Sequence, residues 1–105
     1  MGAKMTRSSG NVFRDLGFSA AEAESLRIRA DLMIQIRLLI EARKLTQTRA
    51  ARVFKVTQPR ISDLVRGKID LFSIDTLVDM LARAGVRVGL TVQHARARSK
   101  RAQAA

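Results

Sequence analysis

The most informative stretch of this chain is LTQTRAARVFKVTQPRISDLVRG, residues 45–67. Thr-Gln occurs in it twice, at Thr46 and at Thr57, and a threonine hydroxyl can cap the first turn of a helix. We therefore predict one helix over residues 47–54 and a second helix that begins after Thr57. Pro59 falls in the first turn of this second helix, where its missing N–H costs little.

The predicted second helix is amphipathic and ends at Gly67, which suits a left-handed C-terminal cap. Its apolar side has a spacing of three and four residues: Ile61, Leu64 and Val65. Its outer side is polar: Gln58, Arg60, Ser62 and Arg66. Two short helices joined by a tight turn, with polar groups outside the second, have the layout of a helix-turn-helix, whose second helix enters a DNA groove.

Two further helices are predicted around this pair. Ser19 and Glu22 have the spacing of a capping box at the start of a long helix over residues 20–43. Its apolar residues spread beyond one stripe, so it buries either two separate surfaces or one broad core face. A last helix runs from the cap Ser73 through Ala84, with Gly85 as its stop signal.

The two ends of the folded region are also apolar. Residues 11–18, NVFRDLGF, are expected to pack across the domain's own core or against a neighbouring chain. After Gly85, alternation of apolar and other residues predicts a strand through Val86, Val88, Leu90 and Val92. A single strand leaves its backbone groups unpaired. Antiparallel pairing with the same strand of a second chain is the economical solution; residues 12–16 or another protein are the alternatives.

Charge is distributed unevenly along the chain. Twenty Lys and Arg against nine Asp and Glu give a net charge of +11. Residues 44–68 hold seven positive residues and one negative, and the stretch from Gln93 onward holds four positive residues. Such clustering favours a polyanionic partner, because each neutralised phosphate releases counterions. The other interpretation is a merely solvated basic surface.

Composition excludes several classes of site. The chain has no cysteine, and its one histidine, His94, cannot form a zinc site and is interpreted as a solvated side chain. Neither paired carboxylates nor a phosphate-binding glycine loop is present, so we expect no enzyme, no cofactor and no metal. Without an apolar run of membrane-span length or a signal-peptide core, we expect a cytoplasmic location and no membrane partner.

The expected fold class is mainly α, a compact four- to five-helix bundle that contains a helix-turn-helix, with a C-terminal β-strand pairing in a dimer. We expect a flexible N-terminal tail over residues 1–10, the domain over residues 11–93 and a basic flexible tail over residues 94–105.

The pattern T-Q-x3-A-x4-V-T-Q-x2-I-S-x4-G, residues 46–67, resembles the Xre (Cro/C1-type) helix-turn-helix family. NVFRDLGF, TQPRISDL (residues 57–64) and K-x3-F-S-x3-L (residues 68–77) are similar to a branch of small single-domain regulators that includes HigA-like antitoxins. The chain departs from the family at Lys55, where members usually carry glycine, at Lys44, where they often do, and at Val65, where glutamate is frequent. A lysine in a left-handed turn costs about 1 kcal/mol relative to glycine.

The resemblance implies a division of roles that the chemistry also permits. Base readout falls to Gln58 on adenine, Arg60 on guanine, and Ser62. The phosphate contacts are Gln47, Arg49, Lys55, Thr57, Arg66 and Lys68. Asp63 is expected to orient a neighbouring arginine, because by itself it repels phosphate.

Together these features predict a sequence-specific DNA-binding repressor that acts as a homodimer on a palindromic operator. The resemblance adds the antitoxin of a type II toxin–antitoxin module, which autoregulates its operon and holds a RelE/HigB-like toxin inactive. The alternatives are a stand-alone Xre-type regulator without a toxin, or a protein- or RNA-interaction module with the same fold.

Overall fold

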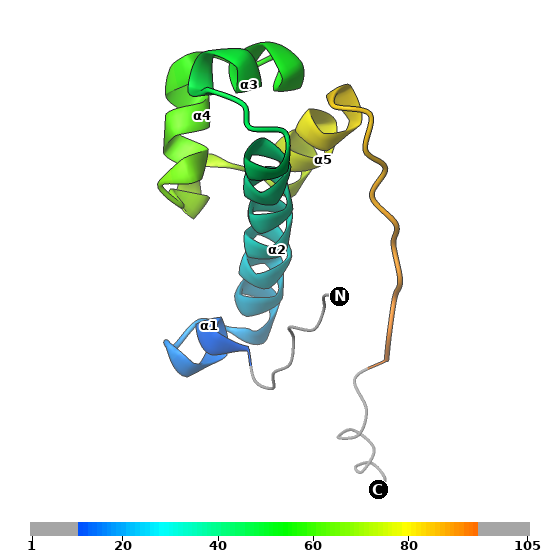
Figure 1. The fold of residues 1–105 in the computed structure, drawn as a ribbon. Helices are drawn as coiled ribbons and strands as arrows, with labels where there is room; N and C mark the ends of the chain where they lie inside the picture. The colour runs from blue at the N-terminus through cyan, green and yellow to red at the C-terminus, as the bar shows by residue number, and fades with distance from the viewer. Residues whose placement is uncertain (1–10, 95–105) are drawn as a thin grey trace, which may run out of the picture.

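A computed structural model describes residues 11–94 of the chain (Figure 1). The predicted N-terminal tail and residues 95–105 of the predicted basic tail lie outside the described residues. The described part is all-helical and contains five α-helices and one short 3-10 helix. They are α1 (Val12–Asp15), α2 (Ala20–Ala42), α3 (Gln47–Phe54), α4 (Gln58–Val65), η2 (Ile69–Leu71) and α5 (Ile74–Arg83).

Each α-helix begins at a side chain that accepts a hydrogen bond from a backbone N–H of the first turn. The predicted caps are confirmed, including the reciprocal capping box of Ser19 and Glu22. The caps are Asn11, Ser19, Thr46, Thr57 and Ser73. Sequence reasoning missed Asn11, although an asparagine directly before an apolar run is an N-cap signal.

The five α-helices also end alike, with a left-handed residue and a backbone bond from the residue after it to the carbonyl five positions earlier. The left-handed residues are Gly17, Lys44, Lys55, Gly67 and Gly85. In the turn after α3, for example, Val56 N–H donates to Ala51 O at 3.0 Å. The chain therefore places lysine at two positions where the backbone conformation favours glycine.

The core is one cluster of side chains to which α2, α3, α4 and α5 all contribute. Its fully buried large side chains are Phe54, Phe72, Ile36, Ile61, Leu64, Leu77, Met80 and Leu81. Ala50, with no exposed surface, lets α3 pack closely. The prediction that Val65 is buried is wrong: the last residue of α4 lies beyond the edge of the face formed by Ile61 and Leu64 and is 36% exposed.

The apolar N-terminal segment forms the short helix α1, which packs against α2 at the end far from α3 (Figure 1). Asn11 ties the two helices, because its Nδ2 donates to the Ala23 carbonyl at 3.0 Å. A four-residue helix can turn only one side toward α2. Phe13 is half-buried, whereas Val12, Leu16 and Phe18 stay exposed, so the domain's own core does not cover these three, and their packing against a neighbouring chain stays a prediction.

The long helix α2 is also apolar on its solvent side. Ile34 and Leu38, one turn apart, are 48% and 50% exposed. An open groove of about 260 Å³ lies beside Ile34, between α2, Phe13 and the end of α4. Of the two interpretations of the wide stripe, a single broad core face is therefore insufficient, because two large residues remain outside the core.

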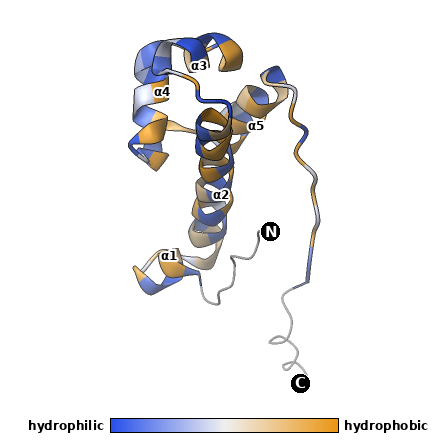
Figure 2. Ribbon diagram, in the orientation of Figure 1, coloured by the Kyte–Doolittle hydropathy of each residue, from blue (hydrophilic) through white to orange (hydrophobic). Residues whose placement is uncertain are grey.

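The predicted C-terminal strand is not formed within residues 11–94. Residues 86–94 run as a drawn-out segment in which hydrophobic and hydrophilic residues alternate (Figures 1 and 2). Val86 is held, since its N–H donates to Leu81 O at 2.9 Å and its side chain packs on the core. From Arg87 onward, no described residue pairs with the backbone of the segment. The alternative of pairing with residues 12–16 is wrong, because those residues form α1.

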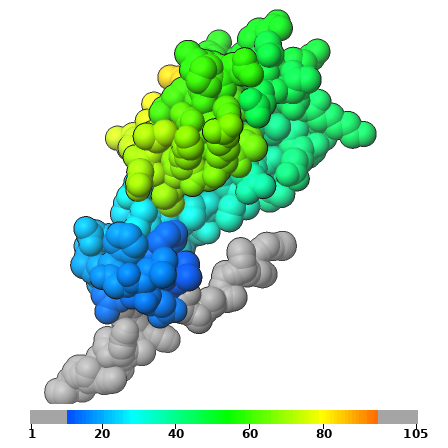
Figure 3. All heavy atoms as spheres, turned by 90° about the vertical axis from the view of Figure 1, so that its left-hand side faces the viewer, coloured from blue at the N-terminus to red at the C-terminus, as the bar shows by residue number. Residues whose placement is uncertain are grey.

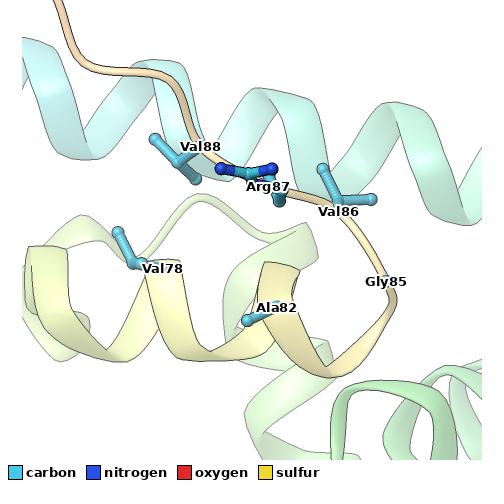
Figure 4. A pocket seen from close by; sticks show the side chains of 6 residues that line it. All are labelled: Val78, Ala82, Gly85, Val86, Arg87 and Val88. Carbon is cyan, nitrogen blue, oxygen red and sulfur yellow. The ribbon is translucent and has the colours of Figure 1, made fainter.

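The start of this segment and α5 enclose an open groove of about 370 Å³ (Figure 4). Val78 of α5 points toward the segment, and Ala82 lies one turn further along α5. Val88, which lines the groove, is 41% exposed, and beyond the groove Leu90 and Val92 are 87% and 85% exposed. The alternation of apolar residues thus continues to Leu90 and Val92, whose side chains the domain does not cover.

Candidate nucleic-acid interface

The helices α3 and α4 form the predicted helix-turn-helix at the end of α2 opposite α1 (Figures 1 and 3). Thr57 caps α4 by accepting from Arg60 N–H at 3.4 Å, and Pro59 lies in the first turn. Ile61 and Leu64 anchor the inner face of α4 in the core. The outer face is left to polar side chains, as a groove-reading helix requires.

The three predicted base-reading residues do not share one face. Gln58 and Ser62 are one turn apart on α4, with Gln58 exposed and Ser62 half-buried. Arg60 lies between them in sequence and therefore points to a different side of the helix. Its guanidinium carbon is 4.4 Å from the centre of the Phe72 ring, and its Nη1 donates to Leu71 O at 3.0 Å.

In this structure Arg60 thus connects α4 to Leu71 and Phe72, at the end of η2. Cation–π stacking and the carbonyl bond each contribute on the order of 1 kcal/mol at a half-exposed site. The sequence did not show this contact, since it depends on how the segment after Gly67 folds back on α4.

The predicted phosphate contacts lie around the same end of the molecule. Gln47 is the first residue of α3, where the helix N-terminus presents backbone N–H groups. Thr57 is exposed at the start of α4. The charged members of the set are all exposed: Arg49, Lys55, Arg66 and Lys68.

Asp63 pairs with a lysine rather than an arginine. Its Oδ1 lies 3.7 Å from Lys68 Nζ, and both side chains are partly exposed. The pair holds Lys68 beside the end of α4 and offsets part of its charge. The expectation that Asp63 orients a neighbouring arginine is therefore wrong, since its ion pair in the structure is with Lys68.

Arginines that sequence reasoning did not single out hold the helix-turn-helix in place. Arg83, in the last turn of α5, donates to the carbonyls of Phe54 and Lys55 at 3.5 and 3.4 Å. Arg43, directly after α2, donates to Ala84 O at 3.4 Å. A cation near a helix C-terminus also interacts favourably with the helix dipole. The turn between α3 and α4 is therefore anchored on α5.

Positive charge is concentrated in one part of the described chain. Residues 43–68 contain eight Lys or Arg and one Asp, a net charge of +7. Residues 11–42 contain four arginines and five acidic residues, and residues 69–94 two arginines and three aspartates, so each of these parts has a net charge of −1. On α2, Arg27 bonds Glu24 and Asp31, which raises the pKa of Arg27 and lowers that of Glu24. The positive surface coincides with α3, α4 and their turns.

The fold and its basic end define a helix-turn-helix protein, a DNA-binding class. A model of the family described as "Helix-turn-helix domain" matches residues 12–93, and the chain belongs to this family. The family is non-enzymatic, so the chain is not an enzyme.

Among solved structures, the chain is similar to one titled "Putative XRE Family Transcriptional Regulator". The two share 24% sequence identity with a TM-score of 0.66, over 71% of this chain and 84% of that one. No curated protein sequence matches the chain. Within residues 11–94, no helix combines the length and the apolar character needed to cross a membrane.

Proposed function

We propose that the chain is an Xre-type transcriptional repressor that recognises a specific operator through α4. The observation that carries this proposal is the exposed polar face of α4 within the end of the molecule that has a net charge of +7. A helix so placed has both parts of a DNA interface, since the charge attracts phosphates and the polar side chains can reach base edges. Such a repressor works in the cytoplasm, where its operator lies.

In this proposal, Gln58 makes a bidentate contact to adenine, and Ser62, one turn on, contacts a base or a phosphate. Arg60 contacts guanine. Its guanidinium either stays stacked on the Phe72 ring during this contact or leaves the ring to make it. The backbone of the duplex is held by the remaining set: Gln47, Arg49, Lys55, Thr57, Arg66 and Lys68.

Two variants of α4 test this division. Gln58→Ala should weaken binding to the specific operator by roughly 1–3 kcal/mol and leave binding to random duplex unchanged. Arg66→Ala should weaken binding to all sequences alike and make the salt dependence of affinity less steep. Gel shifts with the chain's own promoter region and with a shuffled duplex, at several salt concentrations, measure both. Equal loss on both duplexes with Gln58→Ala would falsify base readout by this residue.

The proposed regulator acts as a homodimer on a palindromic operator. What supports the dimer is the segment from Val86 to Val92, whose apolar residues alternate and whose backbone groups from Arg87 onward have no described partner. Antiparallel pairing with the same segment of a second chain satisfies these groups. It also covers the apolar side chains, and a two-fold axis then relates the two α4 helices as a palindrome requires.

A second role as an antitoxin is supported by a different observation. Large apolar side chains are exposed in and directly after α1 and on the outer side of α2: Val12, Leu16, Phe18, Ile34 and Leu38. This surface suits a protein partner, and the proposed partner is a RelE/HigB-like toxin. A stand-alone regulator would leave the surface unoccupied, and an interaction module would use it without an operator.

The antitoxin role is tested by co-expression with the product of the adjacent gene. Copurification of a small basic protein, lost with Leu16→Lys plus Leu38→Lys and retained with the control Gln35→Lys, is the expected result. Failure of the wild-type chain to rescue cells from that protein would contradict the antitoxin role.

A further inference from the structure

The groove between α5 and the segment after it is lined by apolar side chains and stays open. The segment turns back over α5 after Gly85 (Figure 4). Val88 then lies near Val78 of the helix, and Val86 lies closer to Ala82, one turn further along. The groove has a volume of about 370 Å³. It therefore has room for further apolar side chains beside those that line it.

Two large apolar side chains of the same segment have no cover in the described chain. Leu90 and Val92 are 87% and 85% exposed. Both lie on the same side of an extended chain as Val86 and Val88, because side chains alternate with a period of two. The segment, however, runs on past the groove and away from α5 (Figure 1). Leu90 and Val92 therefore do not fill the groove of their own chain.

Antiparallel pairing with a second copy of the segment removes this mismatch, because it sets the end of each strand beside the start of the other. Residues directly opposite each other lie on the same face of such a pair. Pairing of even positions with even positions keeps the apolar side chains together. A slip of one residue would set every apolar side chain opposite an odd position, where the segment has only Arg, Gly, Thr and Gln.

One register keeps this match and uses all four apolar residues, and it is centred on Gly89. Leu90 of each chain then faces Val88 of the other chain. In the same way Val92 faces Val86. From these relations we propose that Leu90 and Val92 of each chain fill the groove between α5 and the segment of the partner chain, with the two-fold axis at Gly89. This inference rests on the proposed strand-paired dimer and assigns its register.

The two neighbouring registers of the same parity lose one of these apolar pairs. A centre one residue closer to α5 sets Val92 opposite Ala84, whose N–H is already bonded to a carbonyl of α5. A centre one residue further on sets Val86 opposite His94. A glycine inside a strand also suits a position that another backbone approaches closely, as Gly89 does at the two-fold axis.

Disulfide formation tests the register, since the chain has no native cysteine. The proposed register sets Arg87 of one chain directly opposite Thr91 of the other, at a Cα separation of about 5 Å, which a disulfide can span. Each of these two exposed residues is about 13 Å along the strand from its own copy. Arg87→Cys mixed with a differently tagged Thr91→Cys chain should give at least five times more disulfide-linked dimer than either variant alone. An equal or greater yield from either variant alone overturns the register.

A pair of charges introduced at Ala82 and Val92 tests the groove. Both side chains are exposed, so the domain should keep its fold. Ala82→Glu in one chain and Val92→Lys in the other set opposite charges at one groove and leave the second groove of the dimer unchanged. This heterodimer should be at least five times tighter than the matched control, Ala82→Lys with Val92→Lys. Equal affinities overturn the packing of Val92 in the partner chain's groove.

Light scattering on the wild-type chain separates failure of this inference from failure of the proposed function. A wild-type dimer whose variants give no disulfide between positions 87 and 91 overturns the register and the filled groove, and leaves the operator-binding dimer standing. A monomeric wild-type chain overturns the strand-paired dimer together with the inference built on it.

Discussion

Lys55 combines a conformational cost with a position at the DNA-facing turn. Its φ of 57° places it in the left-handed region, where a side chain costs about 1–2 kcal/mol relative to a right-handed backbone. Its exposed ammonium group lies at the end of α3, within the basic end of the molecule. Lys44, with a φ of 54°, repeats the arrangement at the end of α2. The same two residues that strain the backbone thus add charge to the proposed phosphate-binding surface.

Replacing Lys55 by glycine should separate these effects. Lys55→Gly is expected to raise the free energy of unfolding by about 1 kcal/mol and to weaken binding to every DNA sequence. Lys68→Gly is the matched control, since Lys68 has an ordinary φ of −76° and removal of its side chain relieves no strain. Urea unfolding and gel shifts measure both quantities. A loss of stability with Lys55→Gly as large as with Lys68→Gly would contradict the strain argument.

Arg60 links the proposed reading helix to the core. Because its guanidinium stacks on Phe72 and bonds Leu71 O, Arg60→Ala should lower the free energy of unfolding without DNA by about 1–2 kcal/mol. Gln58→Ala, at an exposed position of the same helix, should change it by less than about 0.5 kcal/mol. If urea unfolding shows equal stabilities, the stacked conformation is not maintained in solution, and Arg60 serves only the DNA.

At the scale of elements, all five α-helices use the same two devices, a side-chain cap at the start and a left-handed residue after the end. Such caps matter for α3 and α4, because helices of eight residues are marginal by themselves. Arg83 then fixes the turn between them on α5. The reading helix is therefore positioned by local caps and by one long-range tie.

The cap of α4 should be measurable separately from any contact with DNA. Thr57→Ala is expected to lower the free energy of unfolding by about 1 kcal/mol, whereas Thr57→Ser, which keeps the hydroxyl, should restore most of it. Thermal unfolding of the DNA-free chain checks this. Equal melting temperatures for the two variants would mean that the hydroxyl bond to Arg60 N–H adds nothing.

At the scale of the whole molecule, three surfaces serve three partners in the proposed function. The basic end faces DNA, the segment after Gly85 faces a second chain, and the apolar surface on α1 and α2 faces a protein. The first two surfaces are joined through α5, which carries the start of the segment and the arginine that holds the helix-turn-helix turn. Dimerisation and the orientation of the reading helix therefore depend on the same element.

A charge in the segment should disrupt the dimer without disturbing the fold. Leu90→Lys changes a side chain that is 87% exposed, so the domain should keep its stability while the dimer dissociates and operator affinity falls at least tenfold. Thr91→Lys adds the same charge on the other side of the strand and should leave the dimer intact. Light scattering and gel shifts measure both. A stable dimer with Leu90→Lys would move the interface to the exposed side of α2.

Features that depend on near neighbours in the chain could be predicted from the amino-acid sequence. Predicted helix bounds agree with α2, α3 and α5 to within one residue, because caps, periodicity and left-handed stops act over a few residues. The positive φ of Lys44 and Lys55 was likewise expected, because glycine is common at these two positions in the family that the chain resembles. Tertiary structure alone decided that Arg60 stacks on Phe72, that Arg83 holds the α3–α4 turn, and that Val65 and α1 leave apolar surface exposed. These outcomes depend on how helices cross and where they end. The predicted strand after Gly85 is not formed within residues 11–94, where no described residue pairs with its backbone from Arg87 onward.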